Sequence, residues 1–392
     1  MTKPFKTLFR ALMGIMLFLI PASSNATHLL GGSLGYEYIG QQPDGTFRYR
    51  ITALTYTNCG PDSNVPDPDD DLFIGIYEND INNPDADKVL VDQLIISLQD
   101  TTAITSNLPA NCTIGEDVCI VEATYEGFIN LPLNLGGYIV YYQRCCRNDG
   151  VINLNSDEQG FAFYTQMPSP TIENSAPVFL GAPTPFLCQN DTTTFVNTAF
   201  DPDGDQLIFS FVTAKWGYTS AANPNPGPEN PILNWPIAEI GWEAGFDVNQ
   251  PFGPTGYAFI DGATGLTEYS APLAGPYTVA IEVREFRNGV LIGTTIRDIQ
   301  LQVLVCPPNP APDLSDINGG QTDFQVLAGD SICFPVQLED LNGDTIVVTS
   351  AGAIFDPLIF DPAATITTPQ TGAGLVTAEF CWVTSCEQGQ EL

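Results

Sequence analysis

Residues 201–211 read Asp-Pro-Asp-Gly-Asp-Gln-Leu-Ile-Phe-Ser-Phe, and residues 340–350 read Asp-Leu-Asn-Gly-Asp-Thr-Ile-Val-Val-Thr-Ser. Each stretch places an acidic, glycine-containing loop directly before a run that is rich in β-branched or aromatic residues. Such runs favour β-strands. The recurrence of the same loop before the same kind of strand predicts that the chain repeats a β-domain.

The two loops also suit a hard cation. Oxygen-bearing side chains stand at alternate positions and the glycine permits a sharp turn, which is the pattern that Ca²⁺ requires. The alternative is an ordinary Asp-Gly or Asn-Gly turn, which needs no metal. We expect structural calcium at both loops, with the ligands Asp201, Asp203 and Asp205 in the first and Asp340, Asn342 and Asp344 in the second.

The N-terminus has the pattern of a secretory signal peptide. Lys3, Lys6 and Arg10 precede a short apolar core at residues 11–20, and Ser24-Asn25-Ala26 fits a small-x-small cleavage site. The apolar core is too short to favour a membrane span. We therefore expect residues 1–26 to be removed and the rest to be secreted or displayed at the cell surface, with no membrane insertion after cleavage.

Composition excludes some partners. The chain has 12 Lys plus Arg against 46 Asp plus Glu, a formal net charge of −34. Such an acidic surface repels nucleic acid and anionic lipid headgroups. Hydrophobic residues make up 44% of the chain and aromatic residues 10%, so it can bury enough apolar surface to fold rather than remain disordered.

The repeating signal along the chain is period two, interrupted by 32 prolines and 35 glycines. No segment has the pattern of a capped amphipathic helix of three turns. The predicted fold class is all-β, with tandem antiparallel β-sandwiches of the immunoglobulin-like or cadherin-like kind. In the first part of the chain the expected strands are residues 47–56, 72–77, 89–98, 118–129, 138–142 and 161–165.

Two proline-rich stretches, at residues 167–177 and 307–312, read as linkers. They divide the chain into domains at 27–170, 177–306 and 310–392. The last is shorter than the roughly 100 residues of such a sandwich, so we expect it to be incomplete. Within the middle domain, residues 277–286 and 290–305 flank an Asn-Gly pair and predict a β-hairpin.

All ten cysteines follow the predicted cleavage site, as in a disulfide-stabilised exported protein. Cys188 and Cys306 are the only cysteines between the two linkers, and we expect them to bond. Cys112 and Cys119 are a second candidate pair, closing a small loop. Adjacent Cys145 and Cys146 are expected to point to opposite faces of one strand and to find separate partners. A redox or metal role is the alternative, although no Cys-x-x-Cys motif occurs.

An insertion at residues 216–254 holds three of the four tryptophans in a Pro-, Asn- and Gly-rich loop. Flat aromatic faces on a loop suit sugar rings or a protein partner. The alternative is a loop folded over its own apolar cluster. The predicted ligand contacts are Trp216, Tyr218, Trp235, Trp242 and Phe246.

Four segments resemble a known family: Ala-Thr-His-Leu-Leu-Gly-Gly at 26–32, Tyr-Tyr-Gln-Arg-Cys-Cys-Arg-Asn at 141–148, Cys-Phe-Pro-Val-Gln-Leu-Glu-Asp at 333–340 and Phe-Cys-Trp-Val-Thr-Ser-Cys-Glu-Gln at 380–388. They are similar to the N-terminal region of large secreted Bacteroidota proteins of the gliding motility-associated kind, which carry a type IX secretion sorting domain. The resemblance implies tandem immunoglobulin-like or cadherin-like repeats at, or released from, the cell surface.

A catalytic function is not expected. Gly31-Gly-Ser33-Leu-Gly35 matches the nucleophile elbow of serine hydrolases, but the only histidine, His28, precedes it. We predict a non-catalytic, calcium-stabilised structural or adhesion module that is part of a larger secreted protein. Its partner would be an extracellular glycan or a surface protein. The alternatives are a carbohydrate-binding module that uses the middle-domain aromatics, and an accessory region of a secreted polymer-degrading enzyme.

Overall fold

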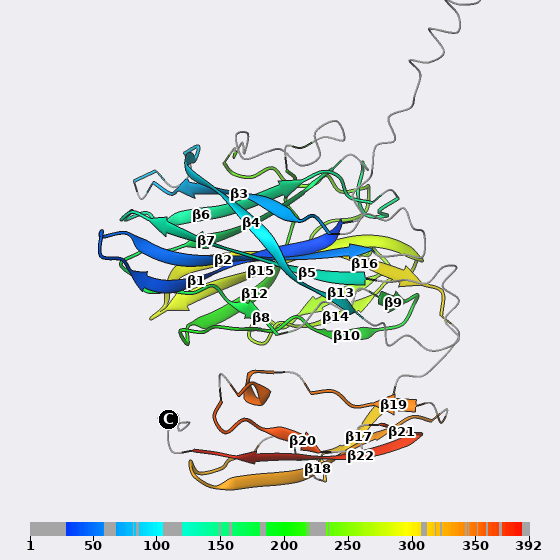
Figure 1. The fold of residues 1–392 in the computed structure, drawn as a ribbon. Coiled ribbons are helices and arrows are strands. Elements are labelled where there is room, and N and C mark those ends of the chain that lie inside the picture. Colours follow the sequence, from blue (N-terminus) through cyan, green and yellow to red (C-terminus); the bar gives the residue numbers. More distant parts are fainter. Residues whose placement is uncertain are drawn as a thin grey trace, which may run out of the picture.

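The structure is a computed structural model of the chain (Figure 1). It describes residues 29–58, 68–80, 82–83, 86–104, 120–148, 150–156, 159–180, 186–217, 219, 233, 235–306, 312–317, 319–321, 324–341, 343, 345–350, 352–357, 360–367 and 371–385. The regular structure of the described residues consists of β-strands and one short 3₁₀ turn, η1 (Ala353–Phe355). The predicted all-β class is therefore correct, and the strand pairs are antiparallel apart from one.

One large sheet contains most of the strands before residue 305. Its order is β1-β2-β5-β4-β3-β6-β7-β16-β15-β12, and β9 pairs in parallel with β16. The bounds are β1 (Leu29–Gln41), β2 (Phe47–Asn58), β3 (Asp71–Glu78), β4 (Val89–Ile104), β5 (Ile120–Leu131), β6 (Tyr138–Arg144), β7 (Phe161–Met167), β9 (Phe186–Cys188), β12 (Gln206–Val212), β15 (Gly275–Arg287) and β16 (Val290–Leu304).

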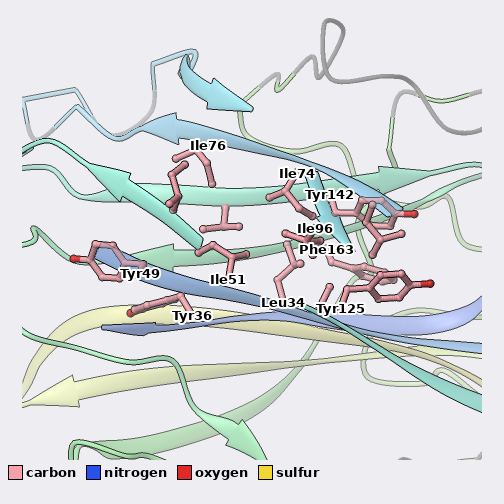
Figure 2. Packing of buried hydrophobic residues seen from close by; sticks show 14 of the residues in the cluster. Leu34, Tyr36, Tyr49, Ile51, Ile74, Ile76, Ile96, Tyr125, Tyr142 and Phe163 are labelled. Carbon is pink, nitrogen blue, oxygen red and sulfur yellow. The ribbon is translucent and has the colours of Figure 1, made fainter. Parts of the chain in front are cut away.

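The first seven strands curl around a common core. β1 and β7, which end this run, both pair with the same edge of β16, so the sheet closes on itself. Alternating side chains of all seven strands fill the interior, as the period-two pattern requires. Figure 2 shows this packing, with the labelled side chains Leu34, Tyr36, Tyr49, Ile51, Ile74, Ile76, Ile96, Tyr125, Tyr142 and Phe163.

A second core lies between the β12-β15-β16 part of the large sheet and a smaller sheet, β10-β14-β13. The smaller sheet consists of β10 (Thr193–Val196), β13 (Tyr257–Ile260) and β14 (Leu266–Ser270), and a short ribbon pairs β8 (Val178–Phe179) with β11 (Ala199–Phe200). The predicted hairpin is present: Arg287 pairs with Val290 across Asn288 and Gly289, which both have positive φ, as a tight hairpin turn requires.

The large sheet continues across the predicted boundary between the first two domains. Thr165 on β7 pairs with Thr295 on β16, and their hydroxyl oxygens lie 2.8 Å apart. Arg147 and Asp298 form a fully buried ion pair between the same two parts of the chain. The first two predicted domains therefore share one sheet, and the linker separates them along the chain only.

The strands after residue 312 form two further sheets, drawn in orange to red in Figure 1. One has the order β17-β18-β22-β20 and the other pairs β19 with β21. A small apolar cluster lies between them, centred on Ile346, Val376 and Ala378. The bounds are β17 (Asp313–Ile317), β18 (Ser331–Glu339), β19 (Thr345–Val347), β20 (Thr365–Thr367), β21 (Thr371–Ala373) and β22 (Leu375–Val383).

Three disulfides join described cysteines. Cys188 bonds Cys306 with Cα atoms 5.4 Å apart, the pairing expected from the sequence, and Cys333 bonds Cys381 directly across β18 and β22. The expectation of separate partners for Cys145 and Cys146 is wrong, because these two bond each other. They follow the end of β6 at Arg144, so the alternation of a strand does not direct their side chains to opposite faces. The candidate pair Cys112 and Cys119 lies outside the described residues.

Candidate metal centre

The first acidic loop forms a tight turn between β11 and β12. Gly204 has a φ of 79° and donates its N–H to the carbonyl of Asp201 at 3.2 Å. Oδ1 of Asp201 accepts the backbone N–H groups of Asp203 and Asp205 at 2.9 and 3.0 Å. The loop is thus an Asx-type turn whose first carboxylate is held inward by its own backbone.

This turn brings two of the predicted ligands together with an acid that the loop motif does not contain. One carboxylate oxygen from each of Asp201, Asp205 and Glu285 lies within 4.8 Å of the other two. Glu285 comes from β15, where it pairs with Leu207 of β12. Asp203, the third predicted ligand of the loop, is not a member of this cluster. Its Oδ2 accepts the N–H of Ser175 at 2.6 Å.

Two oxygens of this cluster have no hydrogen-bond donor. Glu285 is fully buried and Asp201 is 5% exposed, yet Glu285 Oε2 and Asp201 Oδ2 accept no hydrogen bond from any described N–H or hydroxyl group. The two carboxyl groups can hydrogen-bond each other when one of them carries a proton. A buried carboxylate oxygen without a donor is costly unless a proton or a cation compensates it. The buried charge of Asp201 and Glu285 therefore calls for either a bound proton or a bound cation.

The pKa values of Glu285 and Asp201 are both raised, as expected for buried carboxyl groups that lack a compensating charge. Burial raises the pKa of Glu285 to about 8, with the neighbouring Asp201 charge acting in the same direction and the hydrogen bond from Asn174 opposing it. Burial likewise raises the pKa of Asp201, against the two backbone N–H groups that favour its charged form. Without a cation, the cluster holds on to a proton at a pH where an ordinary carboxyl group has lost it.

Arg287 is the cation already present beside the cluster. Its Nε and Nη2 donate to Oδ1 and Oδ2 of Asp205 at 2.8 and 2.6 Å. This bidentate pair neutralises one of the three acids. Each carboxylate oxygen has a second lone pair, so Asp205 can bind the guanidinium and still offer an oxygen to a metal.

The same cluster fastens the segment between the first two predicted domains. Asn174 donates from Nδ2 to Glu285 Oε1 at 2.9 Å and to the hydroxyl of Tyr36 on β1 at 2.8 Å. Its Oδ1 accepts Nη2 of Arg287 at 2.8 Å. Together with the bond from Ser175 to Asp203, these contacts attach residues 174–175 to both β1 and the acidic loop.

A glycine makes space for the buried carboxylate. Gly293 lies on β16 opposite Glu285, and a Cβ added there would collide with Glu285 Oε2 and Cδ. The φ of Gly293 is not in the left-handed region, so the backbone itself does not demand glycine. Glycine at position 293 therefore leaves the space that the Glu285 carboxylate occupies.

The geometry is compatible with Ca²⁺. Two oxygens that bind one ion at about 2.3–2.6 Å can lie no further apart than about 5 Å, and the three cluster oxygens meet that limit. Hard carboxylate oxygens are the donors that Ca²⁺ prefers, and the two without a hydrogen-bond donor are the natural first ligands. Asp201, Asp205 and Glu285 would hold the ion.

The loop motif alone does not reveal Glu285, but the hairpin pattern contains a signal. Tyr277, Val279, Ile281 and Val283 alternate on the buried face of β15, and Glu285 takes the next buried position. An acid at an inward position of an otherwise apolar face marks a buried charge that needs a partner.

The second acidic loop repeats the turn of the first. Gly343 has a φ of 78° and donates its N–H to the carbonyl of Asp340 at 3.1 Å, and Asp340 is buried. This matches the geometry around Gly204 closely. The other two predicted ligands of this loop, Asn342 and Asp344, lie outside the described residues.

The described aromatic residues of the insertion that were predicted to bind a ligand pack against the core. Trp216, Trp235 and Trp242 are partly buried against a core cluster that includes residues of β6, β7, β15 and β16. Trp235 meets Tyr164 edge to face at 6.0 Å, and Phe246 lies against Tyr277 at 6.4 Å. Packing thus accounts for these four side chains, and Tyr218 lies outside the described residues.

The Gly-x-Ser-x-Gly motif lies inside β1. Ser33 is buried and pairs with Leu54 on β2 and Arg297 on β16. A nucleophile elbow needs a sharp turn between a strand and a helix. The surroundings of Ser33 lack that turn.

Comparison of the chain with models of known protein families gives no match. Comparison with curated proteins gives no match either. In the part of the chain that the structure describes, no helix has the length and hydropathy of a membrane span. The functional assignment therefore rests on the geometry of the site.

Proposed function

We propose that the chain is a non-catalytic structural or adhesion module of a larger exported protein, stabilised by calcium at Asp201, Asp205 and Glu285. The observation that carries this proposal is the pair of buried oxygens, Asp201 Oδ2 and Glu285 Oε2, that accept no hydrogen bond from any described N–H or hydroxyl group. A cation between them would neutralise the remaining negative charge and hold the loop, β15 and residues 174–175 together.

Three features support export and a structural role. The disulfides among described cysteines suit an oxidising compartment. The shared sheet and the buried Arg147–Asp298 pair favour a rigid body over a hinged one. The net charge of −34 suits a setting rich in cations. The resemblance to secreted Bacteroidota proteins remains part of the proposal, as do display at the cell surface and the signal peptide, which lies outside the described residues.

The alternative carbohydrate-binding role through the insertion is less well supported, because its described aromatic side chains pack against the core. A role as an accessory region of a polymer-degrading enzyme has no specific observation in its favour.

The test is thermal unfolding with and without calcium. With about 1 mM Ca²⁺ and a Kd of roughly 10⁻⁴–10⁻³ M, one site adds about 0.4–1.4 kcal/mol to the free energy of unfolding. We expect an upward shift in the wild type that is lost in the Asp201→Asn, Glu285→Gln double variant. NaCl at matched ionic strength is the control for general screening. Equal calcium shifts in both proteins would refute the site.

A further inference from the structure

A cavity of about 410 Å³ lies between β1, β2 and residues 175–179. This volume falls in the range of small-ligand sites. The cavity is on the side of β1 opposite to Leu34 and Tyr36, whose side chains fill the core of the curled sheet. It is separate from the carboxylate cluster, although Pro202 of the acidic loop is one of its lining residues.

Gly35 leaves the floor of the cavity open. Gly35 pairs with Thr52 of β2, and Thr52 pairs with Glu126 of β5, so the three positions form a row across adjacent strands. A Cβ added at Gly35 would meet no atom within 4 Å, and the backbone there is not left-handed. Any larger side chain at this position would extend into the cavity without backbone strain.

One end of the cavity carries charged hydrogen-bonding groups. Arg50 forms an ion pair with Glu37, and its Nη1 lies 3.7 Å from Oε1 of Glu126. The Nε of Arg50 is buried and donates no hydrogen bond to any described group. Carboxylate acceptors and a guanidinium donor thus stand side by side. This combination matches neighbouring hydroxyl groups, each of which donates and accepts.

The facing wall is apolar and held in place. Pro177, Val178, Phe179 and Pro202 line it. The wall segment is fixed to β1 by two hydrogen bonds next to it: the N–H of Ala176 donates to the carbonyl of Tyr36 at 2.8 Å, and the N–H of Tyr38 donates to Ser175 Oγ at 3.3 Å. Because this wall is already ordered, it can bind the CH face of a ring with little further loss of conformational entropy.

We propose that this cavity binds a neutral saccharide unit, with its hydroxyls toward Glu37, Arg50 and Glu126 and its apolar face toward Pro177 and Phe179. An anionic ligand is disfavoured, because two carboxylates flank the single guanidinium and the chain as a whole carries a charge of −34. A purely apolar ligand would offer no acceptor to the buried Nε of Arg50. The site uses none of the three carboxylates of the calcium cluster.

The test is calorimetric titration of the purified chain, in constant calcium, with a panel of neutral disaccharides: maltose, cellobiose, xylobiose, mannobiose and N,N′-diacetylchitobiose. We expect at least one to bind, and Gly35→Trp to weaken that binding by at least about tenfold. Gly262→Trp is the matched control, since Gly262 is an exposed turn glycine whose added Cβ would meet only Phe209 O at 3.5 Å. Arg50→Met should also weaken binding, whereas thermal unfolding should change little in either cavity variant.

Binding that survives Gly35→Trp in a folded protein would overturn the proposal, because the sugar would then lie elsewhere. Failure of every disaccharide to bind the folded wild type would also overturn it. Preferential binding of glucuronic acid or of a lysine-containing peptide would assign the cavity to another ligand class. If Gly35→Trp does not fold, the same titration is carried out with Gly35→Leu and Arg50→Met, and weaker saccharide binding is expected in both.

Discussion

Asn174 Nδ2 lies 2.9 Å from Glu285 Oε1, so an amide between the two first predicted domains donates to a carboxylate fully buried in β15. The same amide reaches the hydroxyl of Tyr36 on β1. One side chain thereby joins the curled sheet, the connecting segment and the acidic cluster. Removal of the Asn174 side chain should therefore weaken the contacts among all three parts.

We expect Asn174→Ala to lower the free energy of unfolding by about 1–3 kcal/mol, because it leaves Glu285 Oε1 and the Tyr36 hydroxyl without their partner. Denaturant unfolding measures this change. Asn249→Ala is the control, since Asn249 is exposed and only its backbone N–H forms a hydrogen bond with Asp247. Equal losses in the two variants would show that the bridge contributes nothing specific.

Gly293→Ala should remove calcium stabilisation without changing any acidic residue. The added methyl group would occupy the position of the Glu285 carboxylate and displace Oε2 from the cluster. The measurement is the calcium-dependent shift of the unfolding temperature, with Gly262→Ala as control. A normal calcium shift in Gly293→Ala would mean that Glu285 is not a ligand.

In the presence of a chelator, stability should depend on pH through Glu285. Its pKa is raised from 4.5 to about 8 in the folded chain. Between these values the folded state keeps a proton that the unfolded state releases, so the free energy of unfolding should fall as pH rises from about 4.5 to about 8. Glu285→Gln should flatten this part of the profile. An unchanged slope in that variant would place the titrating group elsewhere.

Arg147 should be essential to the junction between β7 and β16. Its guanidinium donates to both oxygens of Asp298, to the carbonyl of Gly160 and lies 4.0 Å from the ring centre of Phe161, all in the buried interior. Arg147→Met would leave the buried Asp298 carboxylate without its counter-charge and should destabilise the fold by about 3–5 kcal/mol.

The control for Arg147 is Arg284→Gln, which breaks the more exposed Arg284–Glu282 pair and should cost at most about 1 kcal/mol. Denaturant unfolding of both variants gives the comparison. A small effect of Arg147→Met would contradict the view that the first two predicted domains act as one body.

Most strands could be predicted because their information is local. The alternation of apolar side chains placed residues 138–142 and 161–165 within β6 and β7, and Asn288-Gly289 specified the hairpin between β15 and β16. The glycine-rich start of β1 and the short strands β10, β11, β13 and β14 have weak alternation, so the local pattern does not predict them as separate strands.

Long-range pairing could not be predicted in this way. Nothing in the local pattern of β7 indicates that Thr165 meets Thr295, 130 residues away. The same holds for Glu285, since the acidic loop predicts its own carboxylates but not the one that a distant strand brings to it. Strand alternation does not hold for Cys145 and Cys146, because both residues lie beyond the end of β6 at Arg144.

The most direct measurement is calorimetric titration of the purified chain with Ca²⁺, compared with the Asp201→Asn, Glu285→Gln variant. We predict a site in the wild type with a Kd of roughly 10⁻⁴–10⁻³ M, the range of extracellular calcium modules, and its loss in the variant. The second loop, with Asp340, is unchanged in both proteins, so any heat common to both belongs there or to general screening. An identical isotherm for wild type and variant would contradict the proposed calcium site at Asp201, Asp205 and Glu285.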